Sequence, residues 1–144
     1  MTLPRTHVAL RFGACLALAT LSACGADTVQ PAAPATPAPL RLDEHANRTT
    51  VSATVGTPVV VTLHSTYWSG LTSRTPAALA AAGTPRVAPA HSCAPGAGCG
   101  TVELDLRAVR SGSAEITAHR TSCGEARPCV GGAGTYTVTV KIRG

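Results

Sequence analysis

The feature that most limits the fold of this chain is a strict alternation of apolar and polar residues. Val102, Leu104, Leu106 and Ala108 alternate with Glu103, Asp105 and Arg107. A period of two places the apolar side chains on one face of a β-strand and the polar ones on the other. Similar β-type runs occur elsewhere, so we expect strands at Val51–Val55, Val59–Leu63, Val102–Ala108, Ala114–Ala118 and Tyr136–Ile142.

The connections between these runs are rich in glycine and proline, which is typical of turns. The turn Arg110–Ser113 is short, and we expect it to join the runs 102–108 and 114–118 as an antiparallel hairpin. One short helix is expected at Thr75–Gly83, where Thr75 can cap and Pro76 suits the first turn. The fold class predicted is all-β: an antiparallel β-sandwich of about six to seven strands with at most one short helix.

The runs Leu106–Ala118 and Gly134–Val140 resemble the later strands of bacterial immunoglobulin-like domains. This resemblance implies that the sandwich is immunoglobulin-like. It is a pattern of strands and does not assign a site.

The N-terminus has the parts of an export signal. Arg5 and Arg11 precede an apolar run, Phe12–Leu21, which is shorter than the roughly 20 residues of a membrane span. The residues that follow, Ser22, Ala23 and Cys24, complete a sequence that resembles the lipobox of bacterial lipoproteins. That resemblance implies removal of residues 1–23 and a lipid on Cys24, which would anchor the exported protein to the outer side of the bacterial cell membrane. The alternative is an ordinary signal peptide with a cysteine near its end.

Residues 24–47 are expected to form a tether, because Gln30–Pro39 is rich in proline and contains nothing large and apolar. The folded domain is expected over residues 48–144. The formal charge of +5 falls to +3 when Arg5 and Arg11 leave with the signal. No basic cluster with interleaved aromatic residues occurs, so nucleic acid is not expected as a partner.

Four cysteines remain in the expected domain, in two pairs with the same spacing: Cys93 with Cys99, and Cys123 with Cys129. Export exposes a protein to an oxidising compartment, and the loops between paired cysteines can double back. We therefore expect two local disulfides. A zinc site that includes His91 or His119 is the alternative, although the spacing is longer than that of most zinc sites.

No catalytic constellation is evident. His64, Ser65 and Asp105 could be drawn as a triad, but alternation places Asp105 on the solvated face of a strand, together with Glu103 and Glu115. There is no nucleophile elbow, phosphate loop or dinucleotide fingerprint. We expect a non-enzymatic protein without a cofactor or a metal.

The segment His64–Leu71 contains the only tryptophan and one of the two tyrosines. Tyrosine and tryptophan are frequent anchors at protein interfaces, which suggests an aromatic recognition loop. Tryptophan is also a common core residue of immunoglobulin-like sandwiches. We favour the core position for Trp68 and expect Tyr67 to be the exposed residue.

The order of these parts also resembles the chagasin family of cysteine-protease inhibitors. In that family a strand leads into an Asn-Pro-Thr-Thr-Gly-Tyr loop followed by Trp, and a later strand ends in Arg-Pro-Trp. The corresponding stretches here are His64–Gly70 and His119–Cys123. The resemblance implies three loops at one end of the sandwich and matches Arg120 to the family arginine. Thr121 and Ser122 stand where the family has Pro and Trp.

The function predicted is that of a membrane-anchored lipoprotein with a non-catalytic domain that binds a protein partner. The candidate contact residues are Tyr67, Trp68 and Arg120, together with the Cys123–Cys129 ring. Two alternatives remain: a chagasin-like inhibitor of cysteine proteases, and a structural lipoprotein of the cell envelope.

Overall fold

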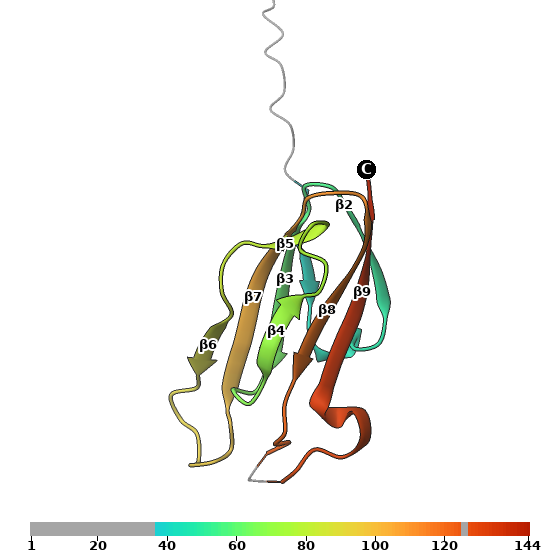
Figure 1. The fold of residues 1–144 in the computed structure, drawn as a ribbon. Helices are drawn as coiled ribbons and strands as arrows, with labels where there is room; N and C mark the ends of the chain where they lie inside the picture. Colours follow the sequence, from blue (N-terminus) through green and yellow to red (C-terminus); the bar gives the residue numbers. More distant parts are fainter. Residues whose placement is uncertain (1–36, 125–126) are drawn as a thin grey trace, which may run out of the picture. The chain divides into compact units, whose positions relative to one another are not determined.

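Two facing β-sheets account for most of the chain that the computed structural model describes, residues 37–124 and 127–144 (Figure 1). The first sheet has the order β1 (Leu40–Leu42), β3 (Pro58–His64), β7 (Gly100–Ala108) and β5 (Leu79–Ala81), with β6 (Arg86–Pro89) also paired to β7. The second has the order β2 (Thr50–Thr54), β9 (Thr135–Arg143), β8 (Gly112–His119) and β4 (Ser69–Ser73). Two short 3-10 turns, η1 (Glu44–Ala46) and η2 (Gly131–Gly134), complete the described elements. The all-β sandwich is confirmed, with nine strands in the described ranges.

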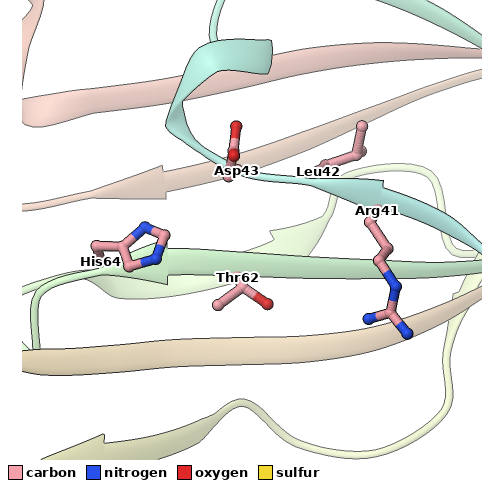
Figure 2. A pocket seen from close by; sticks show the side chains of 5 residues that line it. All are labelled: Arg41, Leu42, Asp43, Thr62 and His64. Atoms are coloured by element: carbon pink, nitrogen blue, oxygen red, sulfur yellow. The ribbon is translucent and has the colours of Figure 1, made fainter. Parts of the chain in front are cut away.

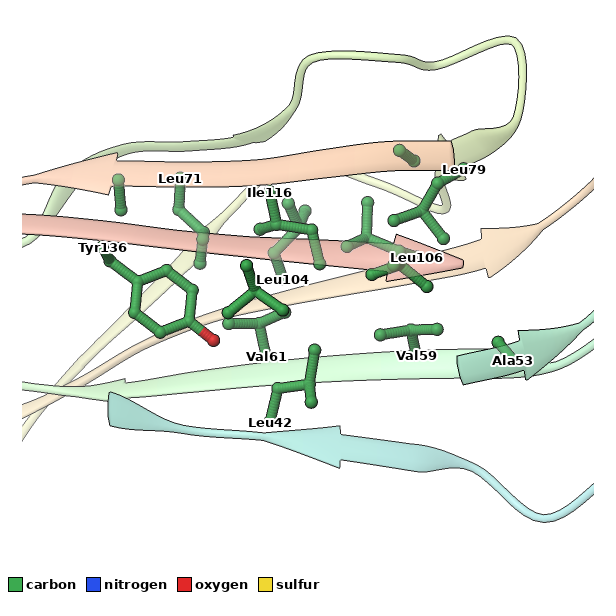
Figure 3. Close-up of a cluster of buried hydrophobic side chains, with 14 of the residues drawn as sticks. Leu42, Ala53, Val59, Val61, Leu71, Leu79, Leu104, Leu106, Ile116 and Tyr136 are labelled. Atoms are coloured by element: carbon green, nitrogen blue, oxygen red, sulfur yellow. The ribbon is translucent and has the colours of Figure 1, made fainter. Parts of the chain in front are cut away.

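The core lies between the two sheets and is built from the predicted apolar faces (Figure 3). On β3, β7, β8 and β9 the alternating apolar residues are almost completely buried, and the residues between them are more accessible. Burial of this surface is the main force that holds the sheets together. The most completely buried large side chains are Tyr136, Leu63, Leu79, Leu104, Ile116, Val59, Val61, Val102, Val138 and Val140.

The expected hairpin between runs 102–108 and 114–118 is wrong. β7 pairs with β3 in the first sheet, whereas β8 pairs with β9 and β4 in the second. The chain crosses between sheets after Ala108, whose amide donates to the Thr57 carbonyl at 3.0 Å. Two strands with one apolar face can bury it side by side in one sheet or face to face across a core, and the alternation is the same in both cases.

The expected helix at Thr75–Gly83 is also wrong. The amides of Ala78 and Leu79 both donate to the Thr75 carbonyl at 3.0 Å, which makes a single turn. Leu79, which is fully buried, then begins β5 and lies opposite Ala108 of β7. Pairing with β7 and burial of Leu79 therefore outweigh the helix propensity of the alanines.

The first two strands depart from the expected antiparallel arrangement. β1 runs parallel to β3, with Leu40 opposite Val59, and β2 runs parallel to β9. β1 precedes the expected domain start at residue 48, and its Leu42 is buried in the core. The expected signal peptide, Cys24 and most of the expected tether lie outside the described residues. In the part of the chain that is described, no helix has the length and hydrophobicity to cross a membrane.

Candidate functional site

Three connections meet at one end of the sandwich, which we call the three-loop end (Figure 1). Its described residues are 65–68, 90–99, 120–124 and 127–134. Strand register brings them together. His64, at the end of β3, lies opposite Thr101 at the start of β7, and Ser69, at the start of β4, lies opposite His119 at the end of β8. His119 in turn lies opposite Thr135, where β9 begins. The chain enters the sandwich at the other end, because Leu40 pairs with the beginning of β3.

The loop that carries Tyr67 rests on the Cys93–Cys99 loop. The amide of Thr66 donates to the Gly98 carbonyl at 2.8 Å, and the Tyr67 hydroxyl donates to the Gly96 carbonyl. The Tyr67 ring packs against Gly98 so closely that a Cβ there would lie 2.3 Å from the ring. Tyr67 is therefore half-buried, and our expectation of an exposed tyrosine is corrected.

The same loop is held in a strained backbone conformation. Ser65 has a φ of 127°, a value that residues with a side chain rarely adopt. Two hydrogen bonds maintain it: the Ser65 amide donates to the Gly100 carbonyl at 2.8 Å, and the Tyr67 amide donates to Ser65 Oγ at 3.2 Å. The surrounding structure thus fixes the path of the chain between β3 and β4.

Trp68 belongs to the core, as the core interpretation expects, with 5% of its surface exposed. Its ring meets Tyr136 edge to face, with the centroids 6.4 Å apart. The Arg120 guanidinium carbon lies 4.4 Å from the Trp68 ring centroid, a cation–π arrangement. Arg120 Nε also donates to the Ala133 carbonyl at 3.4 Å. Trp68 therefore packs against Arg120 and exposes almost none of its own surface.

The third loop is closed on itself by the bond between Cys123 and Cys129. The Cys129 amide donates to the Thr121 carbonyl at 2.9 Å, and the Cys123 amide donates to the Arg127 carbonyl at 2.8 Å. Gly134 is buried beneath this ring, where a Cβ would lie 2.5 Å from the Arg120 carbonyl oxygen. Disulfide and glycine together stiffen the segment that presents Arg120.

Both disulfides have the local pairing that the sequence predicts, since Cys93 is joined to Cys99 in the same way. The sulfur atoms are bonded to one another and are not thiolates available to zinc. Among the described residues no three His, Cys, Asp or Glu side chains lie close enough together to hold a metal ion.

His64 and Asp105 of the hypothetical triad each form a hydrogen bond with a residue outside the triad. His64 Nδ1 lies 2.9 Å from Glu44 Oε2, and Asp105 accepts a hydrogen bond of 3.0 Å from Arg86. The hydrogen bond to Glu44, reinforced by its negative charge, raises the pKa of His64 above the usual value. His64 therefore ties η1 to the end of β3.

A shallow pocket of about 250 Å³ lies beside this ion pair, on the outer face of the first sheet (Figure 2). Its lining is Arg41, Leu42, Asp43, Thr62 and His64. A hydrogen bond from the His45 amide, followed by one from its ring, lowers the pKa of Asp43. The pocket is open and carries mixed charge, and neither Tyr67 nor Arg120 is among its lining residues.

Sequence reasoning missed the residues that hold the loops in place. Gly96 and Gly98 receive Tyr67, and Arg48 lies against η2, where a Cβ on Gly132 would be 1.3 Å from its guanidinium. The signal available was the density of glycine inside the first cysteine ring. Nothing in the sequence indicated that this ring and the Tyr67 loop are in contact.

Comparison with known proteins gives a likeness of fold. No protein-family model and no curated protein sequence matches the chain. Among solved structures, the cysteine protease inhibitor EhICP2 from Entamoeba histolytica matches with a TM-score of 0.53 and 14% identity, over 74% of this chain and 96% of that chain. Amebosin, known from a solution structure, matches with a TM-score of 0.50 and 20% identity, over 73% of this chain and 98% of that one. Each of these chains is thus covered almost completely by the sandwich described above.

Proposed function

We propose that this protein inhibits cysteine proteases of the papain class by placing its three-loop end against the protease cleft. The observation that carries the proposal is the position of Tyr67 and Arg120 in loops at the same end of a sandwich whose fold is shared with a cysteine protease inhibitor. This favours the inhibitor alternative over a binding domain for an unspecified partner.

Stiffness supports an inhibitory role. Each of the two longer loops at this end contains a disulfide, and the shorter loop is hydrogen-bonded to one of them. A loop held in its bound shape loses less conformational entropy on association, so more of the contact energy remains as affinity. A stiff loop also resists the extended conformation that a protease needs in order to cleave it.

The loop chemistry differs from that of the chagasin family, which has Asn-Pro-Thr-Thr before its tyrosine. Here Ser65 and Thr66 precede Tyr67, and the strained Ser65 backbone shapes the loop. Arg120 is positioned by Trp68 and the Ala133 carbonyl, without the Pro and Trp that follow the family arginine. We expect these substitutions to change which proteases are bound.

Inhibition is tested by titrating the purified, disulfide-bonded protein against a panel of papain-class proteases. We expect tight inhibition of at least one protease, reduced at least tenfold by Tyr67→Ala and by Arg120→Ala. Arg110→Ala is the matched control, because Arg110 is exposed in the connection between β7 and β8, away from the three-loop end. No inhibition of any protease, or equal inhibition by all three variants, would refute the proposal.

We further propose that the domain is exported and carries lipid on Cys24, which lies outside the described residues. The disulfides suit an oxidising compartment. Attachment through the N-terminal side would leave the three-loop end free, because the chain enters the sandwich at the opposite end. Mass spectrometry of the membrane fraction should find residues 1–23 absent and Cys24 acylated; an unmodified Cys24 peptide or release into the medium would contradict this.

A further inference from the structure

A fourth connection, residues 43–49 between β1 and β2, also lies at the three-loop end. β1 runs toward this end, because Leu42 lies opposite Val61 near the end of β3. β2 starts from it, because Thr50 lies opposite Thr139 and runs in the same direction as β9. β1 belongs to the first sheet and β2 to the second, so we call this segment the β1–β2 crossover.

On the first sheet the crossover is bonded to the residue directly before the Tyr67 loop. The His64 amide donates to the Glu44 carboxylate, whose other oxygen lies 2.9 Å from His64 Nδ1. His64 is the last residue of β3, and Ser65 follows it in the loop. One carboxylate therefore holds both the backbone and the side chain of the residue at which this loop begins.

On the second sheet the side chain of Asn47 holds the crossover to the beginning of β9. Asn47 Nδ2 donates to the Thr135 carbonyl at 2.9 Å, and Asn47 Oδ1 accepts from the Thr137 amide at 2.9 Å. The Arg48 amide adds a bond of 2.6 Å to the Thr137 carbonyl. Arg48 has a φ of 61°, which is uncommon for a residue with a side chain and persists where the surroundings impose it. Asn47 thus binds the backbone on both sides of Tyr136.

Tyr136 connects this clamp to the two candidate contact residues. Its ring is buried in the core and meets Trp68 edge to face (Figure 3). The Arg120 guanidinium lies over Trp68, and Tyr67 directly precedes Trp68 in the chain. Closely packed side chains do not move independently, so a shift of the Tyr136 backbone is passed on to Trp68 and from there to Arg120 and Tyr67.

Neither buried ring is fixed by a hydrogen bond of its own. The Tyr136 hydroxyl and Trp68 Nε1 are both buried, and neither has a hydrogen-bond partner among the described residues. The orientation of these rings therefore depends on packing and on the backbone that carries them. Asn47 fixes that backbone at Tyr136.

We propose that Asn47 is a positioning residue for protease binding: it fixes the backbone around Tyr136 and thereby holds Trp68, Arg120 and Tyr67 in the arrangement that fits the protease. This inference rests on the proposed inhibitory function and adds a residue that acts without touching the protease. Affinity falls with the fraction of molecules whose loops have the binding arrangement, so loss of the clamp weakens inhibition.

The first measurement needs no protease, because Trp68 is the only tryptophan of the chain and its fluorescence reports the packing of its own ring. In the folded, disulfide-bonded protein, Asn47→Ala should shift the emission to longer wavelength and increase its quenching by acrylamide. Asn47→Asp keeps the acceptor for the Thr137 amide but loses the donor to the Thr135 carbonyl. It should give a smaller shift in the same direction, and it serves where the alanine variant does not fold.

Thr57→Val is the matched control at the opposite end of the sandwich, beside Pro58 where β3 begins. Thr57 is buried, and its Oγ1 accepts from the Thr54 amide at 3.2 Å. This variant loses a side-chain bond to the backbone, as the Asn47 variants do, and should also lower the thermal midpoint. The Trp68 emission should stay unchanged.

The second measurement is the inhibition constant for a protease that the unmodified protein inhibits, at a temperature where every variant is folded. Asn47→Ala should weaken inhibition roughly tenfold, since two hydrogen bonds that hold the arrangement are lost. Thr57→Val should change it less than about twofold. Combined with Arg120→Ala, Asn47→Ala should weaken inhibition less than it does alone, because a residue that it positions is then absent.

The outcomes separate this inference from the proposed function. Unchanged Trp68 emission in both Asn47 variants overturns the clamp, whether or not a protease is inhibited. Shifted emission with unchanged inhibition, or an equal loss of inhibition in Thr57→Val, overturns the positioning role and leaves the inhibitor in place. If no protease of the panel is inhibited, the proposed function fails, and the positioning role fails with it.

Discussion

Replacing Gly98 with alanine should displace the Tyr67 ring, which packs directly against Gly98. Gly98 has a φ of +65°, and an alanine in this left-handed region costs roughly 1–2 kcal/mol. The new Cβ would lie 2.3 Å from the Tyr67 ring, so the ring must move and its hydroxyl bond to the Gly96 carbonyl is lost. That bond contributes about 1 kcal/mol. We expect a total loss of about 2–3 kcal/mol in the free energy of unfolding.

Gly96→Ala is the matched control within the same ring. Gly96 has a φ of +76°, so its replacement carries the same backbone cost, but a Cβ there meets nothing within 4 Å. The difference between the two variants isolates the contact with Tyr67 and should be about 1 kcal/mol or more. For a domain of this size that corresponds to a thermal midpoint roughly 4–8 °C lower for Gly98→Ala than for Gly96→Ala.

The assay is thermal and urea unfolding under non-reducing conditions, with each glycine variant made alone and combined with Tyr67→Ala. Once Tyr67 is absent, the excess cost of Gly98→Ala over Gly96→Ala should disappear. Equal losses in the two single variants, or an excess that persists without Tyr67, would refute the packing of Tyr67 on the first cysteine ring.

Three further predictions concern the rest of the domain. Tyr136→Phe should leave the free energy of unfolding, measured by urea denaturation, unchanged or raise it by about 1 kcal/mol, because the buried hydroxyl has no hydrogen-bond partner among the described residues. A clear decrease in the free energy of unfolding would show that the hydroxyl does have a hydrogen-bond partner. Replacing Cys93 and Cys99 together with serine should lower the same quantity by about 2.4 kcal/mol on the chain-entropy estimate, and no loss would contradict a structural role for this ring. His64→Gln should lower the free energy of unfolding by a few tenths of a kcal/mol below pH 6.5, because the hydrogen bond to Glu44 raises the pKa of this exposed ring. The loss should disappear as the pH rises past the raised pKa. A loss that grows with pH would contradict the ion pair between His64 and Glu44.

Strand faces and disulfides were the parts of the molecule that the sequence determined by itself. The buried residues of β7, Val102 to Ala108, are those that the alternation selects. Cys93 and Cys123 each have a partner within a short glycine- or proline-containing loop. Both features are local: a period of two depends only on near neighbours, and a short ring closes with little loss of entropy.

Only the tertiary structure decided which strands pair and which loops touch. β7 and β8 are adjacent in sequence yet lie in opposite sheets, and the alanines after Pro76 form an edge strand because β7 offers a partner. Two contacts join segments that are far apart in the chain: Tyr67 packs on Gly98, and Arg120 stacks on Trp68. Each of these choices is made by burial and hydrogen bonding between distant residues, which no local pattern encodes.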